Sequence, residues 1–477
     1  MKKILFVSSE VHPLLKTGGL ADVAGSLPLS LAELGQDIRI FMPNYGAITY
    51  NQEVHKKSTL HVDNRTVHIL ETRLPNSDVI VWLLDYPDFF GGHGNPYTDE
   101  YGHAWINSAE RFTLFCRIAV EIAQNRANLD WQADIAHCND WQSGLVPALL
   151  RLEPNRPATV FTIHNMAYQG VFSQETFQQL NLPSELWNHH DIEFYNSMSF
   201  IKGGIACADH ITTVSPTYAL EIQTPEFGYG LNGLLHHRHN ELNGIINGID
   251  LDQWSPETDT RIPQTYSATR LGSKLINKKA LQKHFSLPEN ETIPVIGLIS
   301  RLVEQKGIDL VIDCLESIVD YPMQFVLLGN GDKGFEHRLK NLSYLHPDKI
   351  SINIGYDEDL AHLIEAGADL FLMPSLFEPC GLNQLYSQRY GTLPIVRYTG
   401  GLADTVVDTL PDSITAHTAT GFVFHEATAG ALIETVKRAL LLYANTKVWR
   451  QIQKNAMKKD FSWQNSAEQY LTLYKTL

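Results

Sequence analysis

The chain has 477 residues, of which 44% are hydrophobic and 19% are charged, and its formal net charge is -16. A chain of this length exceeds what one hydrophobic core organises, so we expect two or three domains of ordinary globular composition. The negative charge argues against non-specific binding to nucleic acid and against binding to an anionic membrane.

The cysteines and the N-terminus bear on the cellular compartment. The 5 cysteines include no C-x-x-C pair, which favours a reducing environment over a disulfide or zinc framework. The apolar run at 4–7 is too short for a signal peptide, and no run reaches the roughly 20 apolar residues that a membrane span needs. The sequence therefore predicts a cytoplasmic protein.

The first half of the chain alternates short apolar runs with helical patterns, which is typical of a parallel sheet covered by helices. Strands are predicted at 3–8, 37–42, 79–84, 134–138, 158–163 and 210–214. Helices are predicted at 21–34, 105–125, 142–151, 174–180 and 197–207. A hairpin insert is expected at 53–72, where apolar residues flank the turn at 63–65.

A turn-rich segment at 240–262 is predicted to connect this domain to a second alternating series. Its strands are predicted at 293–299, 323–328, 349–354, 369–373, 394–397 and 421–424. Its helices are predicted at 306–319, 333–345, 358–366, 382–391, 401–409 and 427–443, and a helical tail at 447–477. We expect an α/β fold of two doubly wound, Rossmann-like domains, 1–244 and 245–457, that face each other across a deep cleft, with 458–477 packing back on the first. Ligands of such sheets bind at the carboxyl ends of the strands.

The hexapeptide Thr-Gly-Gly-Leu-Ala-Asp occurs twice, at 17–22 and at 399–404. Both copies are predicted turns between a strand and a helix, where two glycines let the backbone approach a ligand and helix-start N–H groups meet an anion. A helix entry that needs glycine is the simpler interpretation of a single copy. Lys16 precedes only the first copy and is suited to meet a diphosphate, although a solvated lysine is the alternative.

Two cations, Arg301 and Lys306, follow the first predicted strand of the second domain. Arginine offers a fork for phosphate oxygens and lysine a point charge, a combination that suits a leaving diphosphate. Glu378 stands at a predicted helix entry after the fourth strand of that domain, at the same edge of the sheet. The alternatives are a surface pair for the cations and a helix-capping carboxylate for Glu378.

The G-x-G-x-x-G match at 329–334 raises the possibility of an NAD-dependent oxidoreductase. It follows the second strand of its domain rather than the first, so a loop that touches a nucleotide is the preferred interpretation. Residues 357–359 fit a helix cap better than a metal site. Because the sequence also lacks a Cys/His cluster, an H-E-x-x-H motif and a Walker motif, we expect a reaction driven by protein cations, without metal or cofactor.

In the first domain, Asp140 and His164 end two predicted strands. His164 is suited to hydrogen-bond sugar hydroxyls and Asp140 to fix the geometry of the site, but each equally fits a satisfied polar residue at a strand end. Cys380 has no histidine partner nearby in the sequence and is predicted to be a small buried residue rather than a nucleophile.

Together these motifs resemble those of the family of bacterial glycogen synthases and plant starch synthases. The matching segments are 16–23, 137–141, 162–165, 300–302, 306–307, 377–382, 399–404 and 460–463, which extend over nearly the whole chain. The resemblance implies a two-domain glycosyltransferase of the GT-B type. It implies transfer of glucose from ADP-glucose to the non-reducing 4-OH of an α-1,4-glucan such as glycogen, with retention and without metal.

The resemblance also implies roles for individual residues. Arg301 and Lys306 would neutralise the departing diphosphate, and Glu378 would orient the glucosyl ring. The residues implied to act in catalysis are Glu378, Arg301, Lys306, His164 and Asp140. Those implied to bind the substrates are Lys16, Gly18, Gly19, Asn247, Tyr356, Gly381, Leu382 and Asn383.

The sequence departs from the wider retaining group at Tyr386, where a second glutamate is common, so it does not predict a two-carboxylate clamp. Asn383 stands where the bacterial enzymes often have threonine. Three alternatives remain open: an NAD-dependent oxidoreductase, a non-catalytic glucan-binding protein, and a synthase that uses UDP-glucose. We also expect the domains to close on ligand binding about hinges near 244–250 and 455–460.

Overall fold

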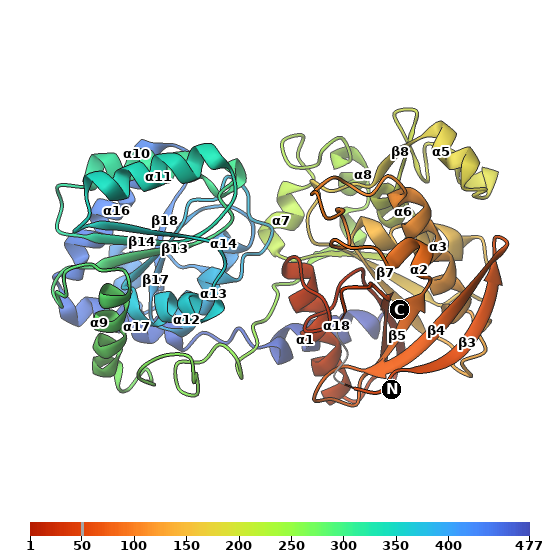
Figure 1. The fold of residues 1–477 in the computed structure, drawn as a ribbon, viewed down its shortest axis with the longest axis horizontal. Coiled ribbons are helices and arrows are strands. Elements are labelled where there is room, and N and C mark those ends of the chain that lie inside the picture. Colours follow the sequence, from red (N-terminus) through yellow and green to blue (C-terminus); the bar gives the residue numbers. More distant parts are fainter. Residues whose placement is uncertain (49–51) are drawn as a thin grey trace. The chain divides into compact units, whose positions relative to one another are not determined.

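The computed structural model describes residues 1–48 and 52–477, which divide into two compact units (Figure 1). Unit 1 comprises residues 1–248 and 463–477, and unit 2 comprises residues 249–462. The chain therefore passes between the units twice, after Gly248 and after Ser462. Within the described ranges, no helix combines the length and the apolarity that a membrane crossing requires.

Unit 1 is built on a nine-stranded sheet in the order β12-β11-β7-β6-β1-β2-β5-β4-β3. Its strands are β1 (Lys3–Val7), β2 (Asp37–Pro43), β3 (His55–Val62), β4 (Arg65–Arg73), β5 (Ile80–Asp85), β6 (Ile135–Asn139), β7 (Ala158–Ile163), β11 (His210–Thr213) and β12 (Leu242–Gly244). The predicted insert is confirmed as the antiparallel hairpin of β3 and β4. Its turn residues Asp63 and Asn64 have φ values of 51° and 59°, which matches a primed turn.

The helices of unit 1 cover this sheet and include every helix predicted for the first half of the chain. They are α1 (Gly19–Glu33), α2 (Pro87–Phe90), α3 (Ser108–Ala123), α4 (Leu145–Arg151), α5 (Gln174–Gln179), α6 (Phe200–Cys207), α7 (Pro216–Glu221), α8 (Asn232–His237) and α18 (Trp463–Tyr474). A small sheet of β8 (Val171–Ser173), β10 (Ser197–Ser199) and β9 (Glu193–Phe194) was not predicted. Helix α18 packs on α1, and the Tyr474 hydroxyl lies 2.6 Å from His137 Nδ1.

Unit 2 contains a six-stranded, fully parallel sheet in the order β15-β14-β13-β16-β17-β18. Its strands are β13 (Val295–Ile299), β14 (Gln324–Gly329), β15 (Ile350–Ile354), β16 (Leu370–Met373), β17 (Leu393–Arg397) and β18 (Phe422–Phe424), all of them predicted. Counted within the unit, this is the order 3-2-1-4-5-6 of dinucleotide-binding Rossmann folds. The predicted α/β class with two Rossmann-like domains is therefore confirmed.

The helices of unit 2 lie on both faces of its sheet, with α10, α11 and α16 on one face and α9 and α12 on the other (Figure 1). They are α9 (Lys274–His284), α10 (Ile308–Ile318), α11 (Lys333–Leu345), α12 (Glu358–Gly367), α13 (Asn383–Arg389), α14 (Gly400–Thr405), α15 (Pro411–Thr415), α16 (Ala429–Tyr443) and α17 (Thr446–Met457). The tail predicted to be helical at 447–477 consists of two helices, α17 and α18, with residues 458–462 between them. Asp357 caps α12 by accepting a hydrogen bond from Leu360 N at 2.9 Å, as expected.

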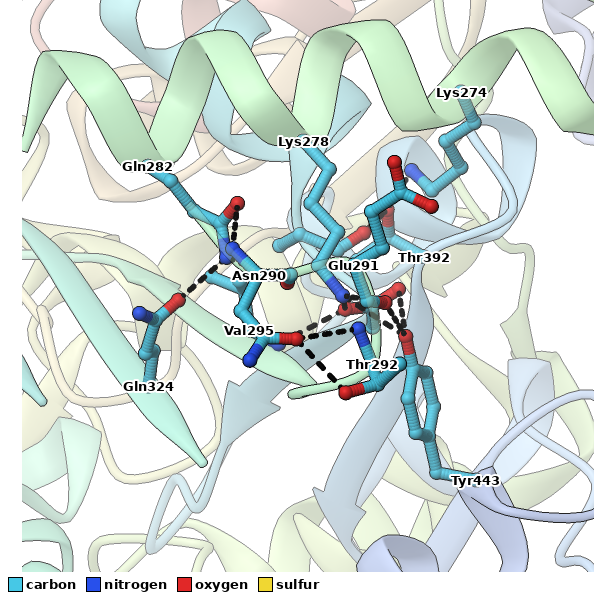
Figure 2. Close-up of polar contacts among 12 residues, drawn as sticks. Lys274, Lys278, Gln282, Asn290, Glu291, Thr292, Val295, Gln324, Thr392 and Tyr443 are labelled. Atoms are coloured by element: carbon cyan, nitrogen blue, oxygen red, sulfur yellow. Dashed lines mark hydrogen bonds and ion pairs between the residues drawn. The ribbon is translucent and has the colours of Figure 1, made fainter. Parts of the chain in front are cut away.

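Helix α9 packs on the sheet through Leu281 and through a buried polar network (Figure 2). Lys278 is almost fully buried, and its Nζ lies 2.8 Å from Asp369 Oδ2. The same ammonium donates to the Glu291 carbonyl and to the Tyr443 hydroxyl. Helix α9 is absent from the sequence prediction because lysines usually mark the solvent face of a helix, whereas these lysines point inward.

Candidate functional site

In unit 2 the strand order reverses between β13 and β16, the place where ligands bind in open α/β sheets. A pocket of about 220 Å³ lies there, lined by residues 298–301 and 372–375 and by the loops that follow both strands. The predicted site residues among its lining are Arg301, Lys306, Glu378, Gly381, Leu382 and Asn383. Eight of the predicted site residues lie in unit 2 or just before its start. The structure brings six of these eight together, from three separate segments of the chain.

The two others of these eight are Tyr356 and Asn247, and neither lines the pocket. Tyr356 lies in the loop between β15 and α12, and 81% of its surface is exposed. Asn247, two residues before the start of unit 2, is buried, and its Oδ1 has no hydrogen-bond partner among the described residues. An unpartnered buried amide oxygen is uncommon in proteins and leaves an acceptor available for a ligand.

Glu378 and Lys306 form an ion pair at the mouth of this pocket. Lys306 Nζ lies 2.5 Å from Glu378 Oε2, and the Ser375 hydroxyl donates to the same oxygen at 3.0 Å. Both side chains are largely buried, with 20% and 9% of their surfaces exposed. The resemblance implies a separate role for each residue, whereas in the structure the lysine holds the carboxylate in place.

Arg301 is placed differently from Lys306. It lies in the exposed loop after β13, and no residue in the described part of the chain forms an ion pair or hydrogen bond with its guanidinium. A guanidinium carries five N–H donors in a fork that matches phosphate oxygens. Arg301 is therefore available to an anion in the pocket without breaking a contact of the protein.

The loop that carries Glu378 is fixed by contacts that the sequence did not predict. Arg397 Nε donates to the Ser375 carbonyl at 2.9 Å, and its Nη2 donates to the Leu376 carbonyl. Gln305 Nε2 donates to the Phe377 carbonyl at 3.1 Å. These bonds end on backbone carbonyls from distant segments, so no local motif signals them. They fix the backbone directly before Glu378.

The second Gly-Gly pair packs directly on the Glu378 loop. A Cβ atom at Gly400 would lie 2.0 Å from the Glu378 carbonyl oxygen, and one at Gly401 would lie 2.1 Å from that of Cys380. Gly400 also has a φ of +43°, which disfavours other residues. This copy begins α14, which confirms a helix entry, and Cys380 is buried as predicted. Its glycines serve backbone packing.

The first Gly-Gly pair faces open space instead. A Cβ atom at Gly19 would meet nothing within 4 Å, and one at Gly18 would meet only Glu10 Oε1, at 4.0 Å. Packing within unit 1 therefore does not require these two glycines, whereas close approach of a ligand would. Lys16, just before them, lies 2.7 Å from Asp22 and keeps 45% of its side chain exposed.

Glu10, three residues after the end of β1, holds the first glycine loop and was not predicted from the sequence. Its Oε2 accepts hydrogen bonds from Thr17 N at 2.6 Å, from Thr17 Oγ1 at 2.7 Å and from Gly18 N at 3.3 Å. Its Oε1 accepts from the Tyr97 hydroxyl at 3.0 Å. Burial raises the pKa of Glu10 above its ordinary value. The only signal in the sequence was a carboxylate two residues after the strand predicted at 3–8.

Asp140 and His164 come together at the carboxyl ends of β6 and β7. Asp140 Oδ1 accepts from His164 N at 2.7 Å and from Asn165 N at 3.4 Å. Burial raises the pKa of Asp140 to about 7, and the charge of Glu10 adds to this effect. No lysine, arginine or histidine of the described chain forms an ion pair with it. Asp140 is thus a buried acid that fixes the backbone at the start of the His164 loop.

The hydrogen bonds of Asn139 define which nitrogen of His164 carries the proton. Asn139 Nδ2 donates to the Val7 carbonyl at 3.1 Å, so its Oδ1 faces His164 Nε2 at 2.9 Å. His164 Nε2 therefore carries the hydrogen, and Nδ1 is left as an acceptor. Burial lowers the pKa of His164 to about 3, so the ring is neutral near pH 7. Such a ring can accept a hydrogen bond from a hydroxyl group.

The raised pKa of Asp140 predicts a pH-dependent stability that Asp140→Asn removes. The pKa of Asp140 in the folded protein, about 7, lies above its value in the unfolded chain, so ionisation of the carboxylate destabilises the fold. This destabilisation is complete above about pH 7 and absent below about pH 4. We expect Asp140→Asn to raise the free energy of unfolding at about pH 8 by about 1–2 kcal/mol, after allowance for relaxation around the charge. Urea unfolding of both proteins measures this. A difference that does not shrink as the pH falls toward 4 would contradict it.

The chain is similar to known proteins over nearly its whole length. Residues 3–237 match the family model "Starch synthase catalytic domain", and residues 280–459 match "Glycosyl transferases group 1". Glycogen synthase 1 of Methylococcus capsulatus is 54% identical over 99% of this chain and 96% of its own length. Glycogen synthase of Cellvibrio japonicus is 51% identical over 100% of both chains. The catalytic domain of starch synthase IV from Arabidopsis thaliana, solved bound to ADP and acarbose, has a TM-score of 0.88 and 31% identity, covering 100% of this chain and 99% of that one.

Proposed function

The chain belongs to the glycogen synthase family and is a glycosyltransferase, and from this premise we propose that it transfers glucose from ADP-glucose to the non-reducing end of an α-1,4-glucan. This reaction elongates glycogen. The observation that carries the proposal is the pocket at the strand-order reversal of unit 2, where Arg301, Lys306 and Glu378 meet. The five free, buried cysteines support the cytoplasm as its compartment.

We assign the nucleotide sugar to unit 2 and the glucan acceptor to unit 1. In unit 2, Arg301 and Lys306 neutralise the diphosphate, and Glu378, held by Lys306, orients the glucosyl ring. The remaining residues proposed to bind the donor are Lys16, Gly18, Gly19, Tyr356, Gly381, Leu382 and Asn383. In unit 1, Asp140 fixes the His164 loop, and His164 and Asn247 bind sugar hydroxyls through the acceptor atoms described above.

A front-face displacement fits these residues better than a double displacement. Double displacement needs a second carboxylate about 5–5.5 Å from the first. Glu378 is the only carboxylate among the described residues that line the pocket, and its Oε2 is paired with Lys306. In a front-face reaction the bond from C1 to the phosphate oxygen breaks while the acceptor O4 bonds to C1 on the same side, and the 4-OH proton passes to the leaving phosphate. Arg301 and Lys306 stabilise the charge that develops on that phosphate.

Glu10→Gln tests whether the first glycine loop contacts the donor. The amide retains one acceptor oxygen but loses the charge and the second acceptor, which loosens Thr17 and Gly18. Loss of about one charge-assisted hydrogen bond predicts a roughly tenfold rise in the KM for ADP-glucose. The KM for glycogen should change less. Initial rates over a range of ADP-glucose concentrations measure this, and an unchanged donor KM would exclude the contact.

The test of the proposed function compares glucose incorporation into glycogen from ADP-glucose and from UDP-glucose. We expect rapid incorporation from ADP-glucose and release of one ADP for each glucose transferred. Preference for UDP-glucose would be consistent with glucosyl transfer but would contradict ADP-glucose as the donor. Binding of glycogen without release of either nucleotide would favour a non-catalytic glucan-binding protein.

A further inference from the structure

Five consecutive backbone carbonyls, those of residues 375–379, accept hydrogen bonds from outside their own segment of the chain. We call this segment the carboxylate loop, because it contains Glu378. Arg397 donates to the first two of these carbonyls, Gln305 to the third and the backbone N–H of Gly401 to the last two. A loop carbonyl that faces solvent would accept from water instead. The backbone of the carboxylate loop is therefore held to other parts of unit 2 along its whole length.

The turn at 397–401 supplies both the Arg397 and the Gly401 donors, and it packs directly on the carboxylate loop. Its two glycines have room for backbone only, since a Cβ atom at either would overlap the carbonyl oxygen of Glu378 or of Cys380. Arg397, the last residue of β17, brings the side-chain donors of this contact. The turn thus holds the loop in two ways, by close backbone packing and by donation from one arginine.

The guanidinium of Arg397 suits this contact because of its shape. Nε donates to the Ser375 carbonyl at 2.9 Å and Nη2 donates to the neighbouring Leu376 carbonyl, so two adjacent nitrogens serve two adjacent peptide units. Nη1 donates to the His425 carbonyl at 3.5 Å, directly after β18. A planar fork holds two acceptors at once, whereas a lysine offers one nitrogen on a flexible stem. Lysine is therefore expected to be a poor substitute for this arginine.

Ser375 connects the backbone that Arg397 holds to the carboxylate of Glu378. The Ser375 carbonyl accepts from Arg397, while the Ser375 hydroxyl donates to Glu378 Oε2 at 3.0 Å. The same carboxylate oxygen lies 2.5 Å from Lys306 Nζ. Arg397 is not among the described residues that line the pocket, so these contacts act on Glu378 through the loop. A shift of the Ser375 backbone would move a donor that the carboxylate uses.

We propose that Arg397 is a positioning residue of the transfer reaction, which holds the carboxylate loop so that Glu378 meets the glucosyl ring in a fixed orientation. This inference rests on the proposed function and adds a residue to the same site. The role differs from that of Arg301 and Lys306, because the N–H groups of Arg397 are directed at peptide carbonyls and not at the diphosphate.

Arg397→Met keeps the length of the side chain and removes its donors. We expect kcat to fall by up to about 10²-fold, the loss that follows when a reacting group is misplaced by about 1 Å. The KM for ADP-glucose and the Kd for ADP from calorimetry should stay close to the wild-type values, and Arg397→Lys should recover only part of the rate. Weakened ADP binding in Arg397→Met with full recovery in Arg397→Lys would show a charge that acts on the diphosphate, and would overturn the inference.

A double-mutant cycle with Glu378→Gln separates positioning from an independent role. If Arg397 acts through the carboxylate, Arg397→Met should lower kcat much less in the Glu378→Gln background than in the wild type, because coupled residues are not additive. Losses that multiply in the double variant would overturn the inference. Arg438→Met is the matched control, because Arg438 also donates to two backbone carbonyls of unit 2, those of Thr409 and Val423. It should lower the stability in urea and leave kcat unchanged.

Gln305→Ala tests the same loop if Arg397→Met does not fold. It removes only the donor to the Phe377 carbonyl, and it should lower kcat by about three- to tenfold, the equivalent of roughly one hydrogen bond. This loss should also shrink in the Glu378→Gln background. Wild-type kcat in the folded variants of both residues would overturn the inference and leave the proposed function intact. Wild-type protein that transfers glucose to glycogen from neither ADP-glucose nor UDP-glucose would reject the proposed function instead.

Discussion

Lys306→Ala is expected to lower kcat by about 10²- to 10³-fold, the range found when one group that stabilises transition-state charge is removed. The variant loses the point charge that faces the leaving diphosphate. It also leaves Glu378 without the ammonium that lies 2.5 Å from its Oε2, so the carboxylate that orients the glucosyl ring becomes free to move. Steady-state rates of ADP release at saturating ADP-glucose and glycogen measure the loss.

Two further variants separate the roles that Lys306 combines. Arg301→Ala removes an unpaired guanidinium and should also lower kcat by about 10²- to 10³-fold, through the loss of charge alone. Ser375→Ala removes only the hydroxyl that donates to Glu378 at 3.0 Å, and a loss of about tenfold is expected. Near-normal kcat in both Lys306→Ala and Arg301→Ala would contradict catalysis by these cations.

Lys278→Met is expected to lower the free energy of unfolding of unit 2 by about 3–5 kcal/mol, because removing one partner of a buried ion pair leaves the other charge uncompensated. The side chains of Lys278 and Asp369 are 3% and 11% exposed, and the pair joins α9 to the residue directly before β16. The two units need not unfold in a single step. Chemical unfolding should therefore show the loss of stability in the transition of unit 2 only.

The neighbouring residue provides the matched control for this prediction. Lys279 lies 2.7 Å from Glu291, but the two side chains are 46% and 53% exposed. Surface pairs contribute little, so Lys279→Met should leave the free energy of unfolding close to that of the wild type. Equal losses in the two variants would show that burial of the Lys278 pair does not decide its contribution.

The strands were predictable because both Rossmann-like sheets are covered on two faces. A strand buried on both faces reads as a continuous apolar run, and the runs at β1 and β14 are buried along almost their whole length. Helix α9 was not predictable from the same rule, because its inward face carries Lys274 and Lys278. Helices α7 and α8 were missed because six residues are too few to establish a helical period.

The candidate site was predictable to the extent that its residues follow strands at a strand-order reversal. Arg301 follows β13 and Asp140 follows β6, so their places could be inferred from position alone. The pairing of Lys306 with Glu378 joins residues 72 positions apart, and the support from Arg397 ends on backbone carbonyls. Neither contact leaves a pattern in one sequence, because each depends on how the loops cross in the folded unit.

The repeated hexapeptide illustrates the same limit. Its two copies are identical in sequence, yet the glycines at 400 and 401 meet the Glu378 loop and those at 18 and 19 face open space. Only the folded surroundings distinguish a packing role from a ligand-binding one. Lys16, which precedes only the first copy in the sequence, lies beside the glycines that face open space.

Proton NMR of the reaction with ADP-glucose and a short maltooligosaccharide tests the central claim most directly. The account predicts growth of an α-1,4 anomeric signal as the ADP-glucose signal falls, with one ADP formed for each glucose added to the chain. A β-linked product would contradict the front-face displacement. Release of free glucose or the absence of ADP would contradict glucosyl transfer to the glucan.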